Sequence, residues 1–156
     1  MTFLSGQVPL ASAFFVPPTD YDVELTASTS NPTLGGSGFI QGHYVIEYGT
    51  RVHAWVEGEL GGSGANVGSG TWFISLPLAA DTTIHRFGSA AAVASTIGHG
   101  RLRVPSGGTA RNVEALLFTP TTVLFYRSDS AGSIDHTDVN TSTSFSMQFS
   151  YLIPAA

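Results

Sequence analysis

Histidine is the most common metal ligand in proteins, and the sequence contains five of them. A zinc site needs three or four ligands that converge at about 2.0–2.3 Å from the metal. His43 and His53 fall on two predicted neighbouring strands, but the expected turn between these strands directs their side chains to opposite faces. His85, His99 and His136 lie far apart in or near loops, and no His-Glu-x-x-His pattern occurs. We expect ordinary surface or interface histidines and no metal cofactor.

Acidic residues gather in one polar loop, at Asp129, Asp135 and Asp138 with His136 between the last two. Carboxylate oxygens are the ligands that Ca²⁺ prefers. The spacing of the EF-hand loop is absent, however, and no glutamate lies near the expected end of such a loop. We expect a solvated turn.

Two further patterns resemble active-site motifs but lack the neighbouring secondary structure or residues that such motifs need. The glycine-rich stretch from Gly61 to Gly70 precedes a predicted strand, whereas phosphate-binding loops open a helix and usually carry a lysine. The chain contains many serines and five histidines but no Gly-x-Ser-x-Gly elbow between a strand and a helix. We therefore expect a protein that is not an enzyme and that carries no cofactor.

The composition points to a surface that contacts other proteins. Only 11% of the residues are charged, against about 25% in an ordinary globular domain. Such a surface is either rich in Ser and Thr or covered by other protein subunits, and we favour the second interpretation. Nucleic acid is not an expected partner, because the net charge is −5 and Arg101 and Arg103 form the only local basic pair.

Nothing in the chain predicts a targeting or membrane segment. The first residues lack the basic and long apolar regions of a secretory signal, and no segment reaches the ~18 apolar residues of a membrane span. Cysteine is absent, so the sequence carries no redox information. We expect a soluble chain made in the cytoplasm, with no membrane partner.

Alternation of apolar and polar residues predicts strands along most of the chain after residue 20. The clearest is the last one, where residues 145, 147, 149, 151 and 153 are apolar and their neighbours mostly serine. Short strands separated by Gly, Pro and Ser turns are typical of an antiparallel β-sandwich, here a jelly roll. We assign residues 21–156 to this single domain, with strands near 21–26, 39–47, 51–60, 71–76, 97–104, 111–118, 121–127 and 145–153.

The predicted hairpin of residues 39–60 is covered on both faces. A two-residue turn at Gly49-Thr50 would place Tyr44 opposite Trp55. One face then holds Tyr44, Ile46, His53 and Trp55, and the other holds Val45, Val52, Ala54 and Val56. A slip of one residue would exchange the faces.

Residues 1–20 read as an extended arm, because Pro9, Pro17 and Pro18 exclude a helix interior. Such an apolar segment either wraps its own domain or docks on a neighbouring subunit. The arm residues that we expect to bind a partner are Phe3, Leu4, Leu10, Phe14, Phe15 and Val16.

Aromatic residues on the predicted strands form either the core or a contact between subunits. Those assigned to the core or to a trimer interface are Tyr44, Trp55, Trp72, Phe145, Phe149 and Tyr151. Exposed Trp and Tyr side chains can also stack on sugars, so a host glycan is a further possible partner through Trp55, Trp72, Tyr44 or Tyr48.

One region resembles a known family. Asn31-Pro32-Thr33-Leu34-Gly35 precedes Gly42-His43-Tyr44 and Gly49-Thr50-Arg51, and Gly70-Thr71-Trp72-Phe73-Ile74-Ser75-Leu76-Pro77 follows. This order is similar to a β-domain of virion proteins in tailed bacteriophages, particularly those of high-GC actinobacteria. The likeness covers about residues 30–80, and Ile74 stands where Phe or a similar apolar residue is expected.

The resemblance implies a component of the virion, commonly a trimer, with no catalytic role. One expected placement is a capsid decoration protein, a homotrimer that binds the major capsid protein on the outer capsid surface through its arm. The other is a tail-fibre or tail-tip protein that binds a host glycan. We favour decoration, because the chain is short, starts with Met1 and has an arm in place of a long N-terminal attachment region.

Overall fold

The fold consists of antiparallel strands throughout the part of the chain that the structure describes. The structure is a computed structural model and describes residues 16–91, 93–104, 109–129 and 132–155. The predicted all-β antiparallel class is confirmed. The strands are β1 (Thr19–Tyr21), β2 (Leu25–Ala27), β3 (Phe39–Glu47), β4 (Arg51–Glu59), β5 (Trp72–Ser75), β6 (Thr96–Val104), β7 (Thr109–Thr119), β8 (Thr122–Arg127), β9 (Gly132–Ser133) and β10 (Ser144–Leu152).

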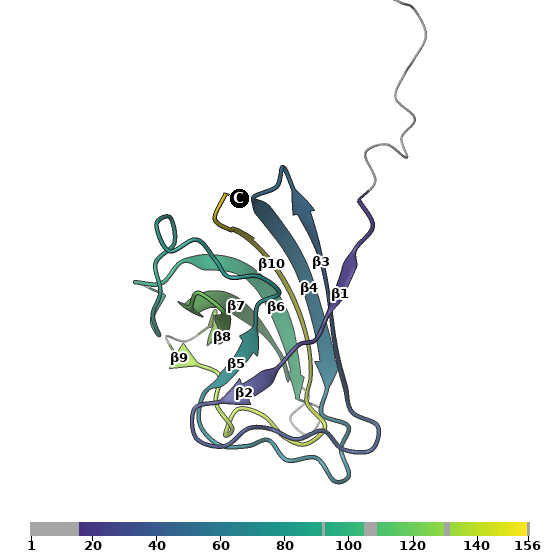
Figure 1. The fold of residues 1–156 in the computed structure, drawn as a ribbon. Coiled ribbons are helices and arrows are strands. Elements are labelled where there is room, and N and C mark those ends of the chain that lie inside the picture. Colours follow the sequence, from purple (N-terminus) through teal and green to yellow (C-terminus); the bar gives the residue numbers. More distant parts are fainter. Residues whose placement is uncertain (1–15, 92, 105–108, 130–131, 156) are drawn as a thin grey trace, which may run out of the picture.

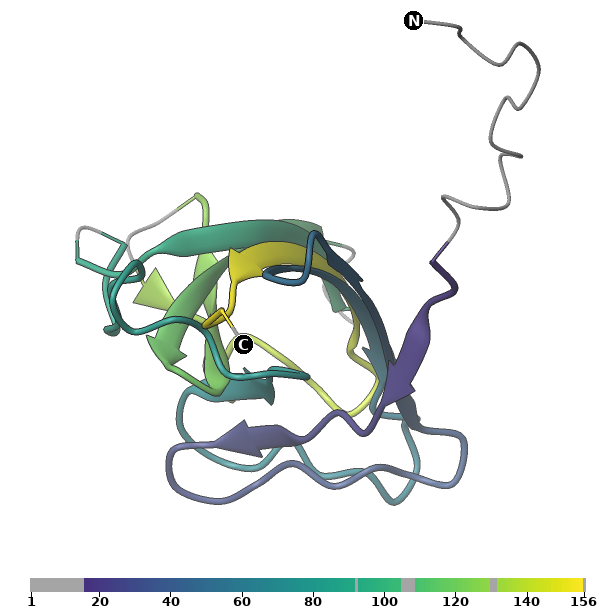
Figure 2. The same ribbon diagram turned by 45° about the horizontal axis from the view of Figure 1, so that its top comes forward.

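All ten strands belong to one sheet, with the order β1-β3-β4-β10-β6-β7-β8-β5-β2 and β9 beside β8. The sheet curls so that its two halves face each other, like the layers of a sandwich (Figures 1 and 2). Phe125 on β8 packs edge-on against Phe145 on β10, with ring centroids 5.4 Å apart. Since β6 and β7 separate these strands in the sheet, this contact crosses the interior. The core therefore fills the inside of the curl.

The two edges of the sheet are joined by a single short segment of chain. β1 pairs with β3 at one end of the strand order and β2 pairs with β5 at the other, yet only residues 22–24 separate them. Ser75 donates its backbone N–H to the carbonyl of Glu24 over 3.0 Å. The Ser75 hydroxyl accepts from the N–H of Glu24 over 2.9 Å. Residues 19–27 thus close the curl, pairing with residues 42–44 of β3 at one edge and with residues 72–74 of β5 at the other.

Strand β10 lies in the middle of one half of the sheet and supplies a large share of the core. Its inward side chains Phe145, Met147, Phe149 and Tyr151 are at most 4% exposed, as the alternation of the sequence predicts. The Tyr151 hydroxyl donates to the carbonyl of Leu78 over 2.8 Å. Burial raises the pKa of Tyr151 well above its ordinary value, so this phenol stays neutral and acts as a packing group.

Close packing between β10 and β6 depends on two glycines of β6. A Cβ atom at Gly98 would lie 2.0 Å from the carbonyl oxygen of Gln148. At Gly100 it would lie 2.1 Å from that of Ser146. Only glycine lets the two strands approach this closely at both positions.

The turn between β3 and β4 differs from the predicted one. Three residues form the loop, with Tyr48 and Gly49 in the left-handed region at φ 52° and 72°. Glu47 therefore pairs with Arg51, and Tyr44 pairs with Ala54 in place of Trp55. The expected turn was wrong because Tyr48 also adopts a positive φ, which starts the turn one residue earlier.

This register corrects both predicted faces of the hairpin. The inward face carries Val52, Ala54 and Val56, each at most 2% exposed, and Tyr44 and Ile46 pack against this core. His43, Val45, His53 and Trp55 therefore lie together on the outward face. The prediction that His43 and His53 point to opposite faces was wrong for the same reason.

The predicted arm of residues 1–20 overlaps the sheet at its end. Thr19 and Asp20 belong to β1, opposite Tyr44 and His43 of β3. Tyr21 completes the strand, and its ring meets that of Tyr44 edge-on with centroids 6.0 Å apart. Residues 1–15 of the arm lie outside the described residues.

The acidic loop between β9 and β10 has a structural role. One carboxylate oxygen of Asp138 accepts hydrogen bonds from Arg111 over 2.6 Å and from Arg127 over 2.9 Å. Asp135 accepts from the backbone N–H and the hydroxyl of Thr137, and these hydrogen bonds lower the pKa of its carboxyl. Asp138 therefore joins this loop to β7 and β8.

Replacing Trp72 tests the core. This side chain is fully buried, and its indole N–H donates to the carbonyl of Val67 over 3.0 Å. We expect Trp72→Ala to lower the free energy of unfolding by about 3–5 kcal/mol, because it leaves a large cavity. Chemical denaturation followed by far-UV circular dichroism measures this change. Trp55→Ala is the matched control and should cost much less, so equal losses would contradict the assignment of Trp72 to the core.

Replacing Asp138 tests whether its hydrogen bonds with Arg111 and Arg127 hold the loop between β9 and β10 in place. Asp138→Ala removes the acceptor of two arginine hydrogen bonds in a largely buried position, and we expect a loss of about 1–3 kcal/mol of unfolding free energy. Asp138→Asn should lose less, since its amide oxygen still accepts. Thermal unfolding of both variants at low and high salt provides the measurement. A neutral effect of Asp138→Ala would show that the loop does not depend on this carboxylate.

Candidate functional site

Among the described residues, a further segment of chain covers one half of the outer face of the curled sheet and not the other. Over β7 and β8, the chain that leads from β5 to β6 places Ala94 against Leu116 and Leu124, and all three are at most 9% exposed. Such a cluster outside the curl shields the β7–β8 half from water. The β3-β4-β10-β6 half has no comparable cover among the described residues.

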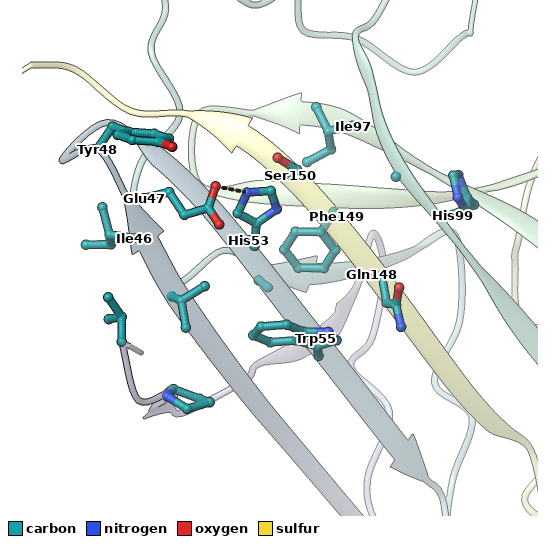
Figure 3. A pocket seen from close by; sticks show the side chains of 15 residues that line it. Ile46, Glu47, Tyr48, His53, Trp55, Ile97, His99, Gln148, Phe149 and Ser150 are labelled. Atoms are coloured by element: carbon teal, nitrogen blue, oxygen red, sulfur yellow. Dashed lines mark hydrogen bonds and ion pairs between the residues drawn. The ribbon is translucent and has the colours of Figure 1, made fainter. Parts of the chain in front are cut away.

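A row of outward residues crosses the β3-β4-β10-β6 half. The strand registers place Asp20 opposite His43, His43 opposite Trp55, and Trp55 opposite Gln148. Gln148 in turn pairs with His99 of β6. Trp55, Gln148 and His99 lie in a line across three strands in Figure 3. The row therefore combines one large aromatic ring with amide and imidazole groups that can hydrogen-bond.

A groove runs along the outer side of β10. Its wider end encloses about 1030 Å³, lined by Trp55, His53, His99, Gln148 and Ser150 among others. The next section encloses about 480 Å³ and shares Trp55, His99 and Gln148 with the first. A third section of about 280 Å³ continues to Ser144. The groove forms because the outward side chains of β10 are mostly serines, whereas those of β4 and β6 on either side are longer.

The two walls of the groove carry opposite charges. Across Ser146 lie Glu57 of β4 and Arg101 of β6. Across Ser144 lie Glu59 and Arg103 in the same arrangement. Two strand spacings separate the backbones of the walls, which is about 9–10 Å.

None of the hydrogen bonds or ion pairs found among the described residues involves the side chains of Arg101, Arg103 or Glu59. The Glu57 carboxylate accepts a hydrogen bond from the amide of Gln41. Donors on one wall and acceptors on the other therefore both face the groove.

Neighbouring carboxylates hold both histidines on the outer side of β3 and β4. His43 Nδ1 lies 2.7 Å from Asp20 of β1, and His53 Nε2 lies 3.0 Å from Glu47 at the end of β3. Figure 3 shows the second pair at the wider end of the groove. These contacts orient the imidazole rings, and the first of them also joins β1 to β3.

Ser150 provides an unpartnered polar atom at the floor of the wider end. Its Oγ is buried and has no hydrogen-bond partner among the residues that the structure describes. Ser150 pairs with His53 in the register of β10 and β4. A buried hydroxyl without a partner is uncommon, and it becomes satisfied when a bound group supplies one.

The arm enters the sheet at the same end of the groove. Val16 and Pro18 line the wider section together with Val45 and Ile46. Val16 is 56% exposed. The part of the groove nearest the arm is therefore apolar, and the part along Ser146 and Ser144 is polar.

The structure shows which of the residues assigned to the core or to a trimer contact are buried and which face outward. Trp72, Phe145, Phe149 and Tyr151 are at most 4% exposed and belong to the core, so their side chains are not available to another subunit. Tyr44 is partly buried and packs at the border of this core. Trp55 is the member of the set that faces outward, with 38% of its surface exposed.

Of the six arm residues expected to bind a partner, Val16 is the one within the described part of the chain. Phe3, Leu4, Leu10, Phe14 and Phe15 lie outside it. Val16 is exposed and lines the groove.

Sequence reasoning missed the polar members of the groove, which include Gln148, Ser146, Glu57, Glu59 and Arg103. The alternation of β10 already placed Gln148 and Ser146 on the face opposite the core. What the sequence did not show was which strands flank β10, because its neighbours β4 and β6 come from distant parts of the chain.

The groups of the groove suit noncovalent binding, through one exposed indole, an amide, imidazoles and charged side chains. Within residues 16–155, leaving out the gaps given above, no three histidine or acidic side chains are placed so that they could hold a metal ion. The same residues include no helix with the length and apolar character needed to cross a membrane.

Comparisons with known proteins leave the chain without an assigned family. A scan against protein-family models, a search of curated proteins and a search of solved structures each found no significant match.

Proposed function

We propose that the protein is a non-enzymatic structural component of a bacteriophage virion, a trimeric capsid decoration protein. Its partner is the major capsid protein on the outer surface of the capsid, and its N-terminal arm makes the principal contact. The observation that carries this proposal is the junction of arm and domain. The arm leads into β1, which is paired with β3, and its last apolar residue Val16 is exposed.

The contacts at the junction fix the end of the arm firmly to the domain. Asp20 of β1 pairs with His43, and the ring of Tyr21 packs beside Val23 under Gly42. A Cβ atom at Gly42 would lie 2.4 Å from the Tyr21 ring, so this glycine makes room for it. An arm anchored in this way holds the whole domain wherever the arm binds.

The arm sequence supplies the binding energy that decoration requires. Burying an apolar side chain such as Leu or Phe contributes about 1.5–3 kcal/mol, from which the cost of ordering the segment is subtracted. Three arms in a trimer would act together, and their combined affinity exceeds that of one arm. The low content of charged residues and the similarity of residues 30–80 to virion β-domains support the same assignment.

A tail-tip protein that binds the host surface is the second candidate. It is favoured by aromatic side chains that face solvent, since Trp55 is 38% and Tyr48 96% exposed. Immunogold labelling of purified virions separates the two placements. Gold over the heads supports decoration, gold at the tail tip favours the second candidate, and particles without gold would contradict both.

Deleting residues 2–16 tests the role of the arm. This deletion keeps Pro17, Pro18 and all of β1, so we expect the domain to fold as before. Binding to capsids that lack the protein should weaken by at least about 100-fold, the ratio that corresponds to losing the burial of one or two apolar side chains. Cosedimentation with such capsids measures the binding, and circular dichroism checks the fold.

The matched control changes polar residues of the arm and keeps its apolar ones. Thr2→Ala, Ser5→Ala and Gln7→Ala together should leave capsid binding within a few-fold of the unchanged protein. Full binding by the truncated protein would refute the arm as the principal contact.

A further inference from the structure

We propose that the groove along β10 binds a neutral oligosaccharide chain, with Trp55 as the stacking platform. This site lies on the domain itself and is independent of the capsid contact proposed for the arm. It would give the protein a second binding activity, directed at polysaccharide.

Trp55 has the position that sugar stacking requires. It is 38% exposed and stands at the junction of the two wider sections of the groove. An indole face attracts the C–H side of a pyranose ring through dispersion and burial of apolar surface. Gln148 and His99 follow Trp55 along the same row, within reach of the hydroxyl groups at the edge of a stacked ring.

The polar section of the groove matches a ligand that both donates and accepts hydrogen bonds. Glu57 and Glu59 on one wall accept, whereas Arg101 and Arg103 on the other wall donate. A hydroxyl group does both, so a polyhydroxylated chain between the walls can satisfy each of them. An apolar ligand would leave these charged groups desolvated and unpaired.

The balance of charge favours a neutral ligand. Two carboxylates face two guanidinium groups along the polar section, and the imidazoles of His43 and His53 stand next to the carboxylates of Asp20 and Glu47. A nucleic acid or other polyanion would need an excess of basic groups on one face. A polycation would be repelled by the positive charges of Arg101 and Arg103.

The length of the groove points to a chain of sugars. From Ser144 to Ser150 strand β10 advances six residues, which is about 20 Å at the rise of an extended strand. This span exceeds one pyranose ring several times.

The N-terminal arm is the competing occupant. Its residues 1–18 include no Asp, Glu, Lys or Arg, and Val16 and Pro18 already line the apolar end. The serines and opposed charges farther along do not match its Phe and Leu side chains. The polar section therefore favours a sugar chain over the arm.

The test uses the full chain and four neutral hexasaccharides, built from glucose, mannose, galactose and N-acetylglucosamine. We expect at least one of them to bind saturably in isothermal titration calorimetry and to change tryptophan emission. Because Trp72 is fully buried, the emission change should come from Trp55 and disappear in Trp55→Phe.

Substitutions in and outside the groove locate the site. Trp55→Ala should weaken binding at least about tenfold, the ratio that corresponds to loss of a stacked ring pair. Gln148→Ala and Arg101→Ala should each weaken it several-fold. Phe118→Ala is the matched control, since Phe118 is an aromatic residue of similar exposure, 37%, on β7, and it should leave the affinity unchanged.

Three results would overturn the proposal. The first is the absence of both heat and an emission change with all four hexasaccharides at millimolar concentration. The second is binding that Trp55→Ala does not weaken, in protein whose circular dichroism shows that it is folded. The third is competition, in which a peptide with the sequence of residues 2–16 binds the truncated protein at Trp55 and no sugar displaces it. None of these depends on whether the protein binds capsids.

Discussion

The arrangement of this protein depends on how the edges of its curled sheet are closed. Residues 19–27 pair with β3 at one edge and with β5 at the other, and the backbone of Glu24 is hydrogen-bonded to Ser75 between them. Because residues 19–27 bridge the two edges, the sheet has one enclosed face, where Trp72, Phe125 and Phe145 meet. Everything on the other face is left to solvent, to the chain segment that carries Ala94, or to a partner.

The enclosed face could be predicted from the sequence to a large extent. The alternation of Phe145, Met147, Phe149 and Tyr151 identified the inward side of β10, and the bounds of β3 agree with the predicted 39–47. Both follow from the period of two in a half-buried strand. The alternation does not reveal how a turn begins, so the positive φ of Tyr48 shifted the β3–β4 register by one residue. Because of this one-residue difference from the predicted register, Trp55 does not lie opposite Tyr44, and His43 and His53 lie on the same face.

The candidate groove could be predicted only in part. The sequence alone identified Trp55 as a candidate binding residue and placed the polar residues of β10 opposite its apolar face, but it did not connect the two. Their combination requires β10 to lie between β4 and β6, an order set by contacts between residues about 40 to 100 positions apart. A pairing of this kind leaves no local pattern in one sequence. The charges that face each other across Ser146 could therefore be recognised only once the strands were placed.

The position of β1 also has a mechanical consequence. Any pull on the chain ahead of Val16 passes into a strand of three residues, and from there through residues 22–24 into the opposite edge of the sheet. A load on this segment is shared between the ladders to β3 and β5, together with the contact between Asp20 and His43. Detaching β1 would expose the free edge of β3 and uncover the ring of Tyr44. Resistance to force and protection of the core are thus properties of the same nine residues.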